Sequence, residues 1–443
     1  MTLMTDTPRE ERFLRLFERL GIRQAHIAGL TALEALVLTT GHRDMAASLT
    51  LFSPPVAEPR MLEALEALSS RLLVIHGDRG PMGAPAGHVG QRLQHAMEVT
   101  LDGYFAAVWS DIAADRADEV VAALLNFLAA QDQQTGLVPA NLPEGDGEVA
   151  GISYRIRGAG PPLVLLPLGL ALSQWEPLLP LLSERYCTIT LGGAHLGFVA
   201  ILENRGTSRG YQAIFRTLVD EINLAPGERI LDVGCGTGVL DRWLARRTAG
   251  ANPITALDLN PYLLREAESL ARREELTRIA FQEGNAEALP FPDASFDVTI
   301  STTVMEEGDA NRMLAELVRV TRPGGRVAAI VRGPDMPMWV NLPLSAEAKR
   351  KAEAPGWGGG KADLGCADSS LYTRFQQAGL VELKFWPQMW VIESGSLSNA
   401  PTATQARLSL DEQPEWQAAV VRATQDGTYF IAQPHHCAVG TKR

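Results

Sequence analysis

The stretch that decides the fold is Arg229–Arg247, "RILDVGCGTGVLDRWLARR". Its apolar, β-branched start predicts a buried parallel strand, and its last part predicts an amphipathic helix. Between them stand the small residues "GCGT". Glycine lets the backbone take tight conformations and approach a ligand closely. Because ligands of open α/β sheets bind beyond the carboxyl ends of the strands, this turn is a candidate ligand site, with Asp232 beside it.

The next strand adds a second signal. It is "PITALDLNP", and it ends in Asp258, about twenty residues after the glycine turn, where an acidic side chain accepts both hydroxyls of a ribose. A glycine turn alone would also fit a nicotinamide-dependent dehydrogenase. Here, however, the spacing is GxGxG, and Leu240 or Asp241 stands where the dinucleotide fingerprint has its third glycine. Further strands alternate with helices along the chain, which predicts a parallel sheet.

Four segments in this order resemble the class I S-adenosylmethionine-dependent methyltransferases, the branch that includes ubiquinone-biosynthesis-type enzymes. They are "LDVGCGTG", "ALDLN", "EGNAEALPFPDASFDVTIS" and "VRVTRPGGRVA", and the resemblance covers roughly residues 205 to 443. It implies an α/β, Rossmann-like domain that binds S-adenosyl-L-methionine. The cofactor-binding residues that it implies are Asp232, Gly234, Cys235 and Gly236 around the methionine part, Asp258 on the ribose, Leu259 and Asn260 beside the adenine, Asn285 and Ala286 on the adenine amine side, and Ser301 and Thr302 below the methionine.

Asn285 departs from the usual residue of the family, and Tyr211 lies upstream of the four segments. The family usually has Asp where Asn285 stands, but the amide carbonyl also accepts a hydrogen bond from the adenine amine, so weaker but intact binding is expected. Upstream, Tyr211 is a candidate for the cofactor carboxylate or for the substrate, together with Arg205 and Arg209.

The acceptor side is less defined, because in-line transfer from a sulfonium needs positioning more than a fixed set of catalytic groups. The candidates for catalysis are Glu306 and Glu307 in "STTVMEEGDANRM". A carboxylate there could act as a base or pair with a cationic substrate. The alternative is a solvated helix N-terminus, where acidic residues are favoured anyway. The acceptor atom stays open between O, N, S and C.

A long segment rich in Gly, Pro and Trp, about 333–370, follows the fifth strand. Loops of this length are usually functional lids. Its apolar side chains either line an apolar acceptor site or only cover the sheet edge: Met336, Met338, Trp339 and Trp357. The chain closes with "FIAQPHHCAVGTKR", which predicts an antiparallel edge strand. In a strand His435 and Cys437 share one face and His436 takes the other, so no metal site is expected.

The first two hundred residues resemble an α/β-hydrolase whose halves occur in reversed order, as circular permutation would produce. "HIAGLTALEALVL" resembles the nucleophile elbow, "RLLVIHGDRGPMG" the acid strand and "GISYRIRGAGPPLVLLPLG" the beginning of that fold. The predicted domains are 1–200 and 201–443, with a linker at about 131–149 inside the first. The strand in "PPLVLLPLG" should then pair with "AHIAGL" in one hydrolase-like sheet, separate from the methyltransferase sheet.

The hydrolase chemistry is expected to be lost. The elbow pattern G-x-S-x-G has Thr31 in place of Ser and Leu33 in place of the second Gly. Gly80 stands at the position of the acid and Tyr104 at that of the histidine. Three replaced members of one triad make this region a non-catalytic domain in our interpretation.

Composition sets the remaining expectations. The chain of 443 residues has a net charge of −12, whereas a nucleic-acid partner would call for a basic face. Its longest apolar run is too short and too broken to span a bilayer. Four cysteines without CxxC spacing suit a reducing cytoplasm. The sequence therefore predicts a cytoplasmic methyltransferase acting on a small molecule, with a homodimer left open. The alternatives are non-methyl chemistry on the same cofactor and a non-catalytic cofactor-binding interaction protein.

Overall fold

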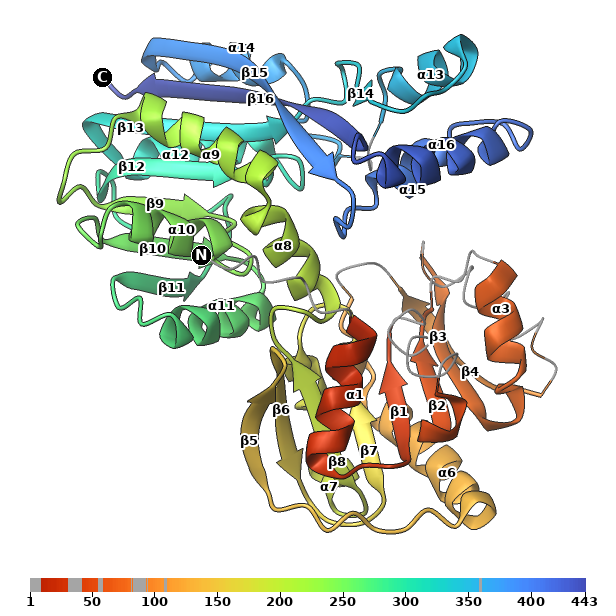
Figure 1. The fold of residues 1–443 in the computed structure, drawn as a ribbon. Helices are drawn as coiled ribbons and strands as arrows, with labels where there is room; N and C mark the ends of the chain where they lie inside the picture. Colours follow the sequence, from red (N-terminus) through yellow and green to blue (C-terminus); the bar gives the residue numbers. More distant parts are fainter. Residues whose placement is uncertain are drawn as a thin grey trace. The chain divides into compact units, whose positions relative to one another are not determined.

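The chain divides into two compact units, Met1–Ala200 and Ile201–Arg443, each of which is described by itself (Figure 1). The computed structural model describes residues 9–30, 42–54, 59–80, 82, 93, 95–106, 110–357 and 361–443. None of the helices in these ranges combines the length and the apolar character needed to cross a membrane.

The described residues of the N-terminal unit form one sheet of eight strands. The strands are β1 (Ala25–Gly29), β2 (Ala46–Phe52), β3 (Leu72–Arg79), β4 (Met97–Phe105), β5 (Gly145–Val149), β6 (Ile152–Arg157), β7 (Pro162–Leu165) and β8 (Cys187–Gly192). The helices are α1 (Arg9–Leu20), η1 (Arg43–Met45), α3 (Pro59–Glu66), η2 (Ser69–Arg71), α5 (Ile112–Asp115), α6 (Ala117–Thr135), η3 (Leu172–Trp175) and α7 (Leu179–Ser183).

Strand order in this sheet is β4-β3-β2-β1-β7-β8-β6-β5. The central pair β1 and β7 is parallel, with His26 beside Leu163 and Ala28 beside Leu165. The predicted pairing of these two distant apolar segments in one sheet is therefore confirmed. Both strands are buried along their whole length, which explains why they lie at the centre of the sheet and not at a wet edge.

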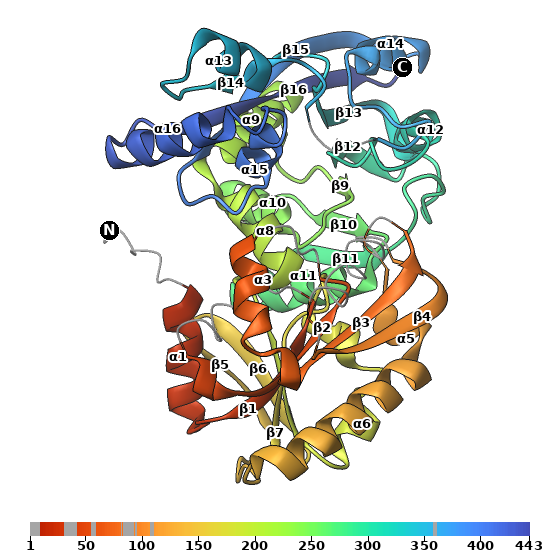
Figure 2. The same cartoon turned by 90° about the vertical axis from the view of Figure 1, so that its right-hand side faces the viewer.

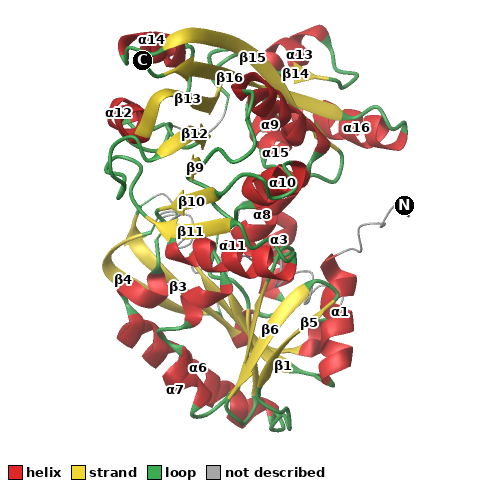
Figure 3. Ribbon diagram, turned by 90° about the vertical axis from the view of Figure 1, so that its left-hand side faces the viewer, coloured by secondary structure: helices red, strands yellow, loops and turns green. Residues whose placement is uncertain are grey.

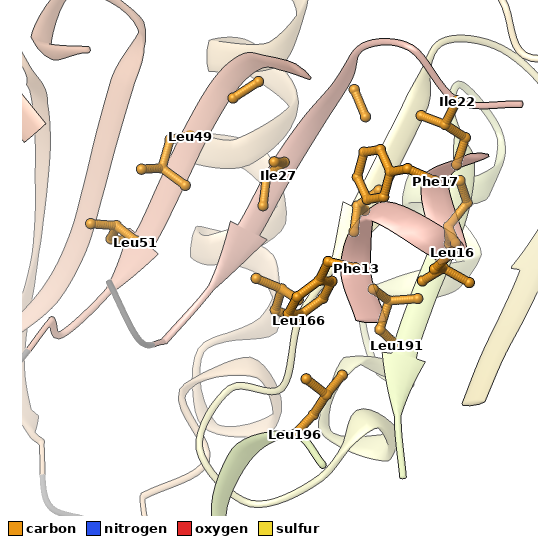
Figure 4. Close-up of a cluster of buried hydrophobic side chains, with 14 of the residues drawn as sticks. Phe13, Leu16, Phe17, Ile22, Ile27, Leu49, Leu51, Leu166, Leu191 and Leu196 are labelled. Carbon is orange, nitrogen blue, oxygen red and sulfur yellow. The ribbon is translucent and has the colours of Figure 1, made fainter. Parts of the chain in front are cut away.

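Helices cover both faces of this sheet. The side chains of Phe13, Leu16 and Phe17 in α1 pack on one face against β-strand residues such as Ile27 and Leu49 (Figure 4). On the other face α5, α6 and α7 form a second cluster with strand residues of β3 and β7, and Figure 2 shows α6 along the sheet. The two clusters make a three-layer α/β unit.

The segment expected to be a linker, 131–149, is mostly regular structure. Helix α6 continues to Thr135 and ends at Gly136, which takes a left-handed conformation with a φ of 61°. Strand β5 then begins at Gly145 and pairs with β6 as an antiparallel edge strand. Polar composition suggested a linker, but an edge strand is polar because it faces water. The irregular connection is confined to 136–144.

The predicted triad positions carry no hydrolase chemistry where the structure describes them. Thr31 lies outside the described residues. Gly80 has a φ of +87°, and a Cβ atom there would meet the carbonyl oxygen of Ala106 at 2.4 Å, so an acidic side chain does not fit. Tyr104 stands at the position expected for the triad histidine. Its hydroxyl donates to Asp115 at 3.0 Å, and the residue offers no imidazole.

A different Ser–His–Asp chain is buried in this unit. His26 Nδ1 lies 2.7 Å from the Ser48 hydroxyl and Nε2 lies 2.9 Å from Asp132, which also accepts from Tyr186 at 2.8 Å. His26 and Ser48 are 0% and 1% exposed and stand at or near the amino ends of β1 and β2, away from the edge where ligands of α/β sheets bind. The network therefore ties strands to α6 and is closed to substrate.

This network predicts acid sensitivity of the N-terminal sheet. Burial lowers the pKa of His26 from its ordinary value of 6.5, although Asp132 opposes this. Below about pH 6.5 the unfolded chain binds a proton that the folded chain does not, so stability falls as the pH falls. Hydrogen exchange of β1 and β2 should become faster between pH 7 and 5, after correction for intrinsic rates. In His26→Gln this pH dependence should be reduced, and an unchanged dependence would show that His26 is not its source.

The C-terminal unit has its own sheet. Its strands are β9 (Ile230–Val233), β10 (Ile254–Asp258), β11 (Ile279–Glu283), β12 (Phe296–Thr302), β13 (Thr321–Arg332), β14 (Trp339–Val340), β15 (Val381–Glu393) and β16 (Phe430–Thr441). Its helices are α8 (Gly197–Thr207, which begins in the first unit), α9 (Arg209–Ile222), α10 (Val239–Arg247), α11 (Pro261–Arg273), α12 (Ala310–Val320), α13 (Ala346–Glu353), α14 (Ser370–Gln377), α15 (Ala400–Gln405) and α16 (Gln413–Gln425).

Parallel strands in the order β11-β10-β9-β12-β13 form a Rossmann-like sheet that continues into antiparallel β16 (Figure 3). The prediction of an edge position for β16 was wrong. Ala438 pairs with Ala329 of β13 on one side and with Phe385 of β15 on the other. Strand β15 was not foreseen, because Pro387 interrupts its sequence and alternate residues are exposed. It covers the strand that would otherwise be the edge.

Helices α9 and α10 pack on one face of this sheet and α12 and α14 on the other. The His435 ring lies 6.2 Å from the ring of Tyr211 in α9, whereas His436 Nδ1 lies 2.8 Å from the Tyr372 hydroxyl in α14. Cys437 belongs to the core on the α9 side. The predicted alternation of these three residues is confirmed.

Candidate cofactor site

The glycine-rich turn lies where strand order reverses, beyond the carboxyl end of β9. Gly234, Gly236 and Gly238 all have positive φ angles, of +83°, +56° and +67°. The amides of Gly234 and Cys235 donate to the carbonyl of Leu257 at 2.7 and 3.0 Å, which ties the turn to β10. A Cβ atom on Gly234 would lie 2.1 Å from Val304. Glycine is therefore required here by both conformation and space.

Asp258 joins the end of β10 to this turn. One carboxylate oxygen accepts from the Gly236 amide at 2.7 Å and the other from the Asn260 amide at 2.9 Å. Burial raises the pKa of Asp258, and the backbone hydrogen bonds oppose that rise. A carboxylate has about four acceptor positions, so Asp258 keeps acceptor capacity for a ligand hydroxyl beyond the backbone amides of Gly236, Asn260 and Leu259.

The residues predicted to lie around the adenine differ in exposure and in how many of their polar groups are already engaged. The Asn260 side chain caps α11 by accepting from the amides of Tyr262 and Leu263, both at 3.0 Å, so its oxygen is committed to the helix. Leu259 is 67% exposed and offers an open apolar surface. Asn285 accepts from the Glu287 amide at 2.8 Å, which leaves its second lone pair and its NH₂ group for other partners. Ala286 is half-buried nearby in sequence.

Ser301 and Thr302 are both buried at the end of β12, but as neighbours in a strand they face opposite sides. Ser301 pairs in register with Val233 of β9, and Thr302 pairs with Ile330 of β13. The Thr302 hydroxyl has no hydrogen-bond partner among the described residues, and neither has the buried Tyr211 hydroxyl. The Arg205 guanidinium lies 5.1 Å from the centre of the Tyr211 ring.

A buried ionic clamp, which the sequence did not reveal, holds the turn to α8. Glu203 accepts from the Thr237 hydroxyl at 2.6 Å and pairs with Arg242 at 2.5 Å. Arg242 also donates to the Thr237 carbonyl at 2.7 Å and to Glu274 at 2.9 Å. Arg242 and Thr237 are 2% and 0% exposed. The clamp thus fixes the turn from outside, through residues far apart in the chain.

Beneath the same turn lie two buried carboxyl groups, Asp232 of β9 and Asp241 of α10, which are 5% and 2% exposed. Burial raises the pKa of Asp232 well above its ordinary value, and the charge of Asp241 raises it further. Burial also raises the pKa of Asp241. One oxygen of each has no partner among the described residues.

The two carboxylates proposed for catalysis differ in their surroundings. Glu306 is 2% exposed, and both of its oxygens are engaged by Arg332, one of them by the backbone amide at 2.6 Å. A carboxylate held in this way is structural. The Glu307 side chain is 53% exposed and lies 3.4 Å from Arg332. Of the two, only Glu307 faces solvent.

Residues 336–357 of the segment predicted to be a lid share a small core with α16, whereas Cys366 belongs to the core of the sheet and residues 358–360 lie outside the described residues. Met338 and Trp357 are buried with residues of α13 and α16, such as Ala348 and Trp416, and the Trp357 indole donates to the Met336 carbonyl at 3.0 Å. Trp339 is 55% exposed and packs against Phe430. Met338 and Trp357 therefore hold the segment together, and Trp339 alone of the four presents a large exposed apolar side chain.

The clamp yields a stability prediction. Arg242→Met leaves Glu203 buried without its cation, and removing one partner of a buried pair costs about 3–5 kcal/mol. Native-state hydrogen exchange of β9 and α10 in increasing denaturant should show this loss. The double variant Glu203→Gln with Arg242→Met removes both charges and should recover most of the lost stability. Equal losses in the single and double variants would contradict the clamp.

Residues 230–325 match the family described as "Methyltransferase domain". The matched segment begins at β9 and ends inside β13, so it contains the glycine-rich turn, Asp258 and Asn285. Over this segment the chain is similar to methyltransferase domains.

Three curated proteins resemble this chain over a limited stretch. An uncharacterized protein of Mycobacterium tuberculosis, Rv1405c, is 42% identical over 114 residues, 26% of this chain and 40% of that protein. A malonyl-(acyl-carrier protein) O-methyltransferase of Erwinia billingiae is 42% identical over 103 residues, 23% of this chain and 38% of that protein. A demethylmenaquinone methyltransferase of Renibacterium salmoninarum is 41% identical over 113 residues, 25% of this chain and 44% of that protein. The chain thus spans less than half the length of these relatives.

Among solved structures, the YcgJ protein of Bacillus subtilis is 18% identical to this chain, with a TM-score of 0.35. The similarity covers 52% of this chain and 99% of that one. A similarity at this TM-score carries no argument about the fold or the function of this chain.

Proposed function

We propose that the C-terminal unit binds S-adenosyl-L-methionine at the turn after β9 and transfers its methyl group to a small-molecule acceptor. The observation that carries this proposal is the junction of Asp258 with the Gly236 amide at 2.7 Å, inside the segment that matches the methyltransferase domain. The turn offers a close backbone approach, and the carboxylate beside it offers acceptors for a ribose. These are the groups that a nucleoside-type cofactor needs.

In this proposal the chain's own residues bind and orient. Gly234, Cys235 and Gly236 line the methionine part, with Asp232 beneath them, and Asp258 holds the ribose. The remaining proposed contacts are Leu259 and the backbone of Asn260 beside the adenine, Asn285 and Ala286 on its amine side, and Ser301, Thr302 and Tyr211 around the methionine. The cofactor supplies an activated methyl group on a sulfonium. Holding the acceptor in line with that group supplies most of the catalysis.

For the base or cation-pairing role we propose Glu307 alone. Its side chain is 53% exposed, whereas both oxygens of Glu306 are held by Arg332. The charge of Arg332 opposes the rise that burial gives to the pKa of Glu307. A carboxylate that faces solvent in this way can accept a proton or attract a cation.

The N-terminal unit is, in our proposal, a permuted α/β-hydrolase-like scaffold without hydrolase activity. Its support is the parallel pairing of β1 with β7 within one eight-stranded sheet. Further support comes from Gly80 and Tyr104, which offer neither the acid nor the imidazole of a triad. The role left to such a unit is structural.

The first test is methyl transfer itself. Incubation with S-adenosylmethionine and a panel of acceptors should yield S-adenosylhomocysteine with at least one of them. The panel holds thiols, phenols and amines, with a hydroquinone and a carboxylic acid added because the names of two relatives point to such acceptors. Cofactor binding without S-adenosylhomocysteine from any acceptor would favour the two alternatives, non-methyl chemistry or a cofactor-binding interaction protein.

Asp258→Ala tests the cofactor site. Losing hydrogen bonds to a charged group costs about 1.5–3 kcal/mol, so the affinity for S-adenosylmethionine should fall about ten-fold or more. Calorimetry measures this directly. Asp293→Ala is the matched control, because it removes a carboxylate that is 78% exposed and should leave the affinity unchanged. Equal affinity of Asp258→Ala and wild type would remove Asp258 from the site.

A further inference from the structure

Two carboxyl groups, Asp232 and Asp241, are buried together beneath the glycine-rich turn. We propose that Asp241, through a proton that it shares with Asp232, makes this site favour the positively charged methyl donor over its neutral product. The inference rests on the proposed function and adds to it a residue that determines cofactor selectivity.

The geometry requires a shared proton. Both residues are at least nine-tenths buried, and Asp232 Oδ1 and Asp241 Oδ2 have no hydrogen-bond donor among the described residues. Beyond the effect of burial, Asp241 nevertheless acts on Asp232 through its charge and through a side-chain hydrogen bond, and both raise the pKa of Asp232. Two carboxylates in contact and shielded from water cannot both ionise. One proton between them gives each unpartnered oxygen a partner.

The charges around the pair do not remove the need for this proton. Burial raises the pKa of Asp241 overall although the charge of Arg242 lowers it, and the Arg242 guanidinium pairs with Glu203 and Glu274. The other titratable groups that act on the turn are Asp258 and Cys235, and burial, with the three nearby aspartates, raises the pKa of the Cys235 thiol. A neutral thiol adds no charge, and Asp258 adds a negative one. The pair therefore lies in surroundings with an excess of negative charge.

This excess distinguishes the two forms of the cofactor. S-adenosylmethionine carries a sulfonium, and S-adenosylhomocysteine has a neutral thioether in the same place. During transfer the methyl carbon bonds to the acceptor, and the electron pair of the broken carbon–sulfur bond stays on sulfur, which becomes neutral. A positive charge at the turn favours the ionised form of Asp241 beside a protonated Asp232. Binding of the donor therefore releases the proton of Asp241 and leaves one proton shared by the pair, and the released proton returns when only the product is bound.

Selectivity should then depend on pH. Burial raises the pKa of Asp241 to about 7, so measurements at pH 6 and pH 8 bracket the ionisation of Asp241. Asp232, whose pKa is raised well above its ordinary value, keeps the one proton that the pair then shares. The dissociation constants of S-adenosylmethionine and S-adenosylhomocysteine are measured by calorimetry at both pH values. The preference for the donor should increase about five-fold or more from pH 6 to pH 8, a change typical of coupling between sites.

Asp241→Asn provides the decisive comparison. Its amide donates a hydrogen bond to Asp232 in the same space and holds no exchangeable carboxyl proton, so the pH dependence of the preference should vanish. Asp220→Asn is the matched control, because it removes the charge of an exposed carboxylate that pairs with Arg247. The ligands' own amino groups titrate in the same way against all three proteins, so a difference between the proteins isolates the pair.

A second measurement needs only the wild type. Binding enthalpies in buffers of different ionisation enthalpy count the protons released, and at pH 7 the donor should release more protons than the product does. Equal release, or a preference that changes with pH to the same extent in Asp241→Asn, would overturn the inference while leaving the proposed function intact. Failure of both ligands to bind would overturn the proposed function itself.

Discussion

The hydrogen bond from the Gly236 amide to the Asp258 carboxylate, 2.7 Å long, is the constraint on which the rest of the C-terminal unit depends. It joins the ends of two neighbouring parallel strands, and it does so only because the turn at 234–238 takes positive φ angles that open its amides toward β10. The sheet order brings β9 and β10 side by side. The glycines of the sequence, the conformation of the turn and the adjacency of β9 and β10 therefore all favour the same structure. Such consistency is typical of a well-specified fold.

The turn is held from two sides by different means. On one side the clamp of Glu203, Thr237 and Arg242 satisfies every charge that it buries. On the other side Asp232 and Asp241 are buried near each other, and no salt bridge among the described residues pairs either of them with a cation. Buried charges are tolerated where they are paired, and an unmatched pair of acids avoids the cost by keeping a proton. The clamp fixes the conformation of the turn. The acid pair instead holds a proton whose release, in our proposal, depends on the charge of the bound ligand.

Local motifs were readable in the sequence, and contacts between distant residues were not. The glycine turn and the alternation of His435 and His436 depend on neighbours within a few residues, and Asp258 follows the turn at the spacing of about twenty residues that is typical of a ribose-binding acid, so the sequence predicted all three. Glu203 and Arg242 are 39 residues apart, and nothing in the sequence of either indicates the other. The edge position of β16 was wrong for the same reason, because its cover, β15, comes from a segment interrupted by Pro387. Glu306 looked like a base because Arg332, its partner, is supplied by another strand.

Two hydrogen-bonded chains of catalytic-type residues show why residue identity alone does not define a site. Ser48, His26 and Asp132 are linked at 2.7 and 2.9 Å, and Tyr372, His436 and Asp335 are linked at 2.8 Å in both steps. The first chain contains the residue types of a hydrolase, yet its hydroxyl is sealed at the amino end of the sheet. The edge where a hydrolase would act instead presents Gly80 and Tyr104. Chemistry in an α/β sheet follows from which edge a group reaches and whether a ligand reaches it too. The turn after β9 lies at the carboxyl edge of its sheet, and for this reason we propose the turn, and not the chain of Ser48, His26 and Asp132, as the ligand site.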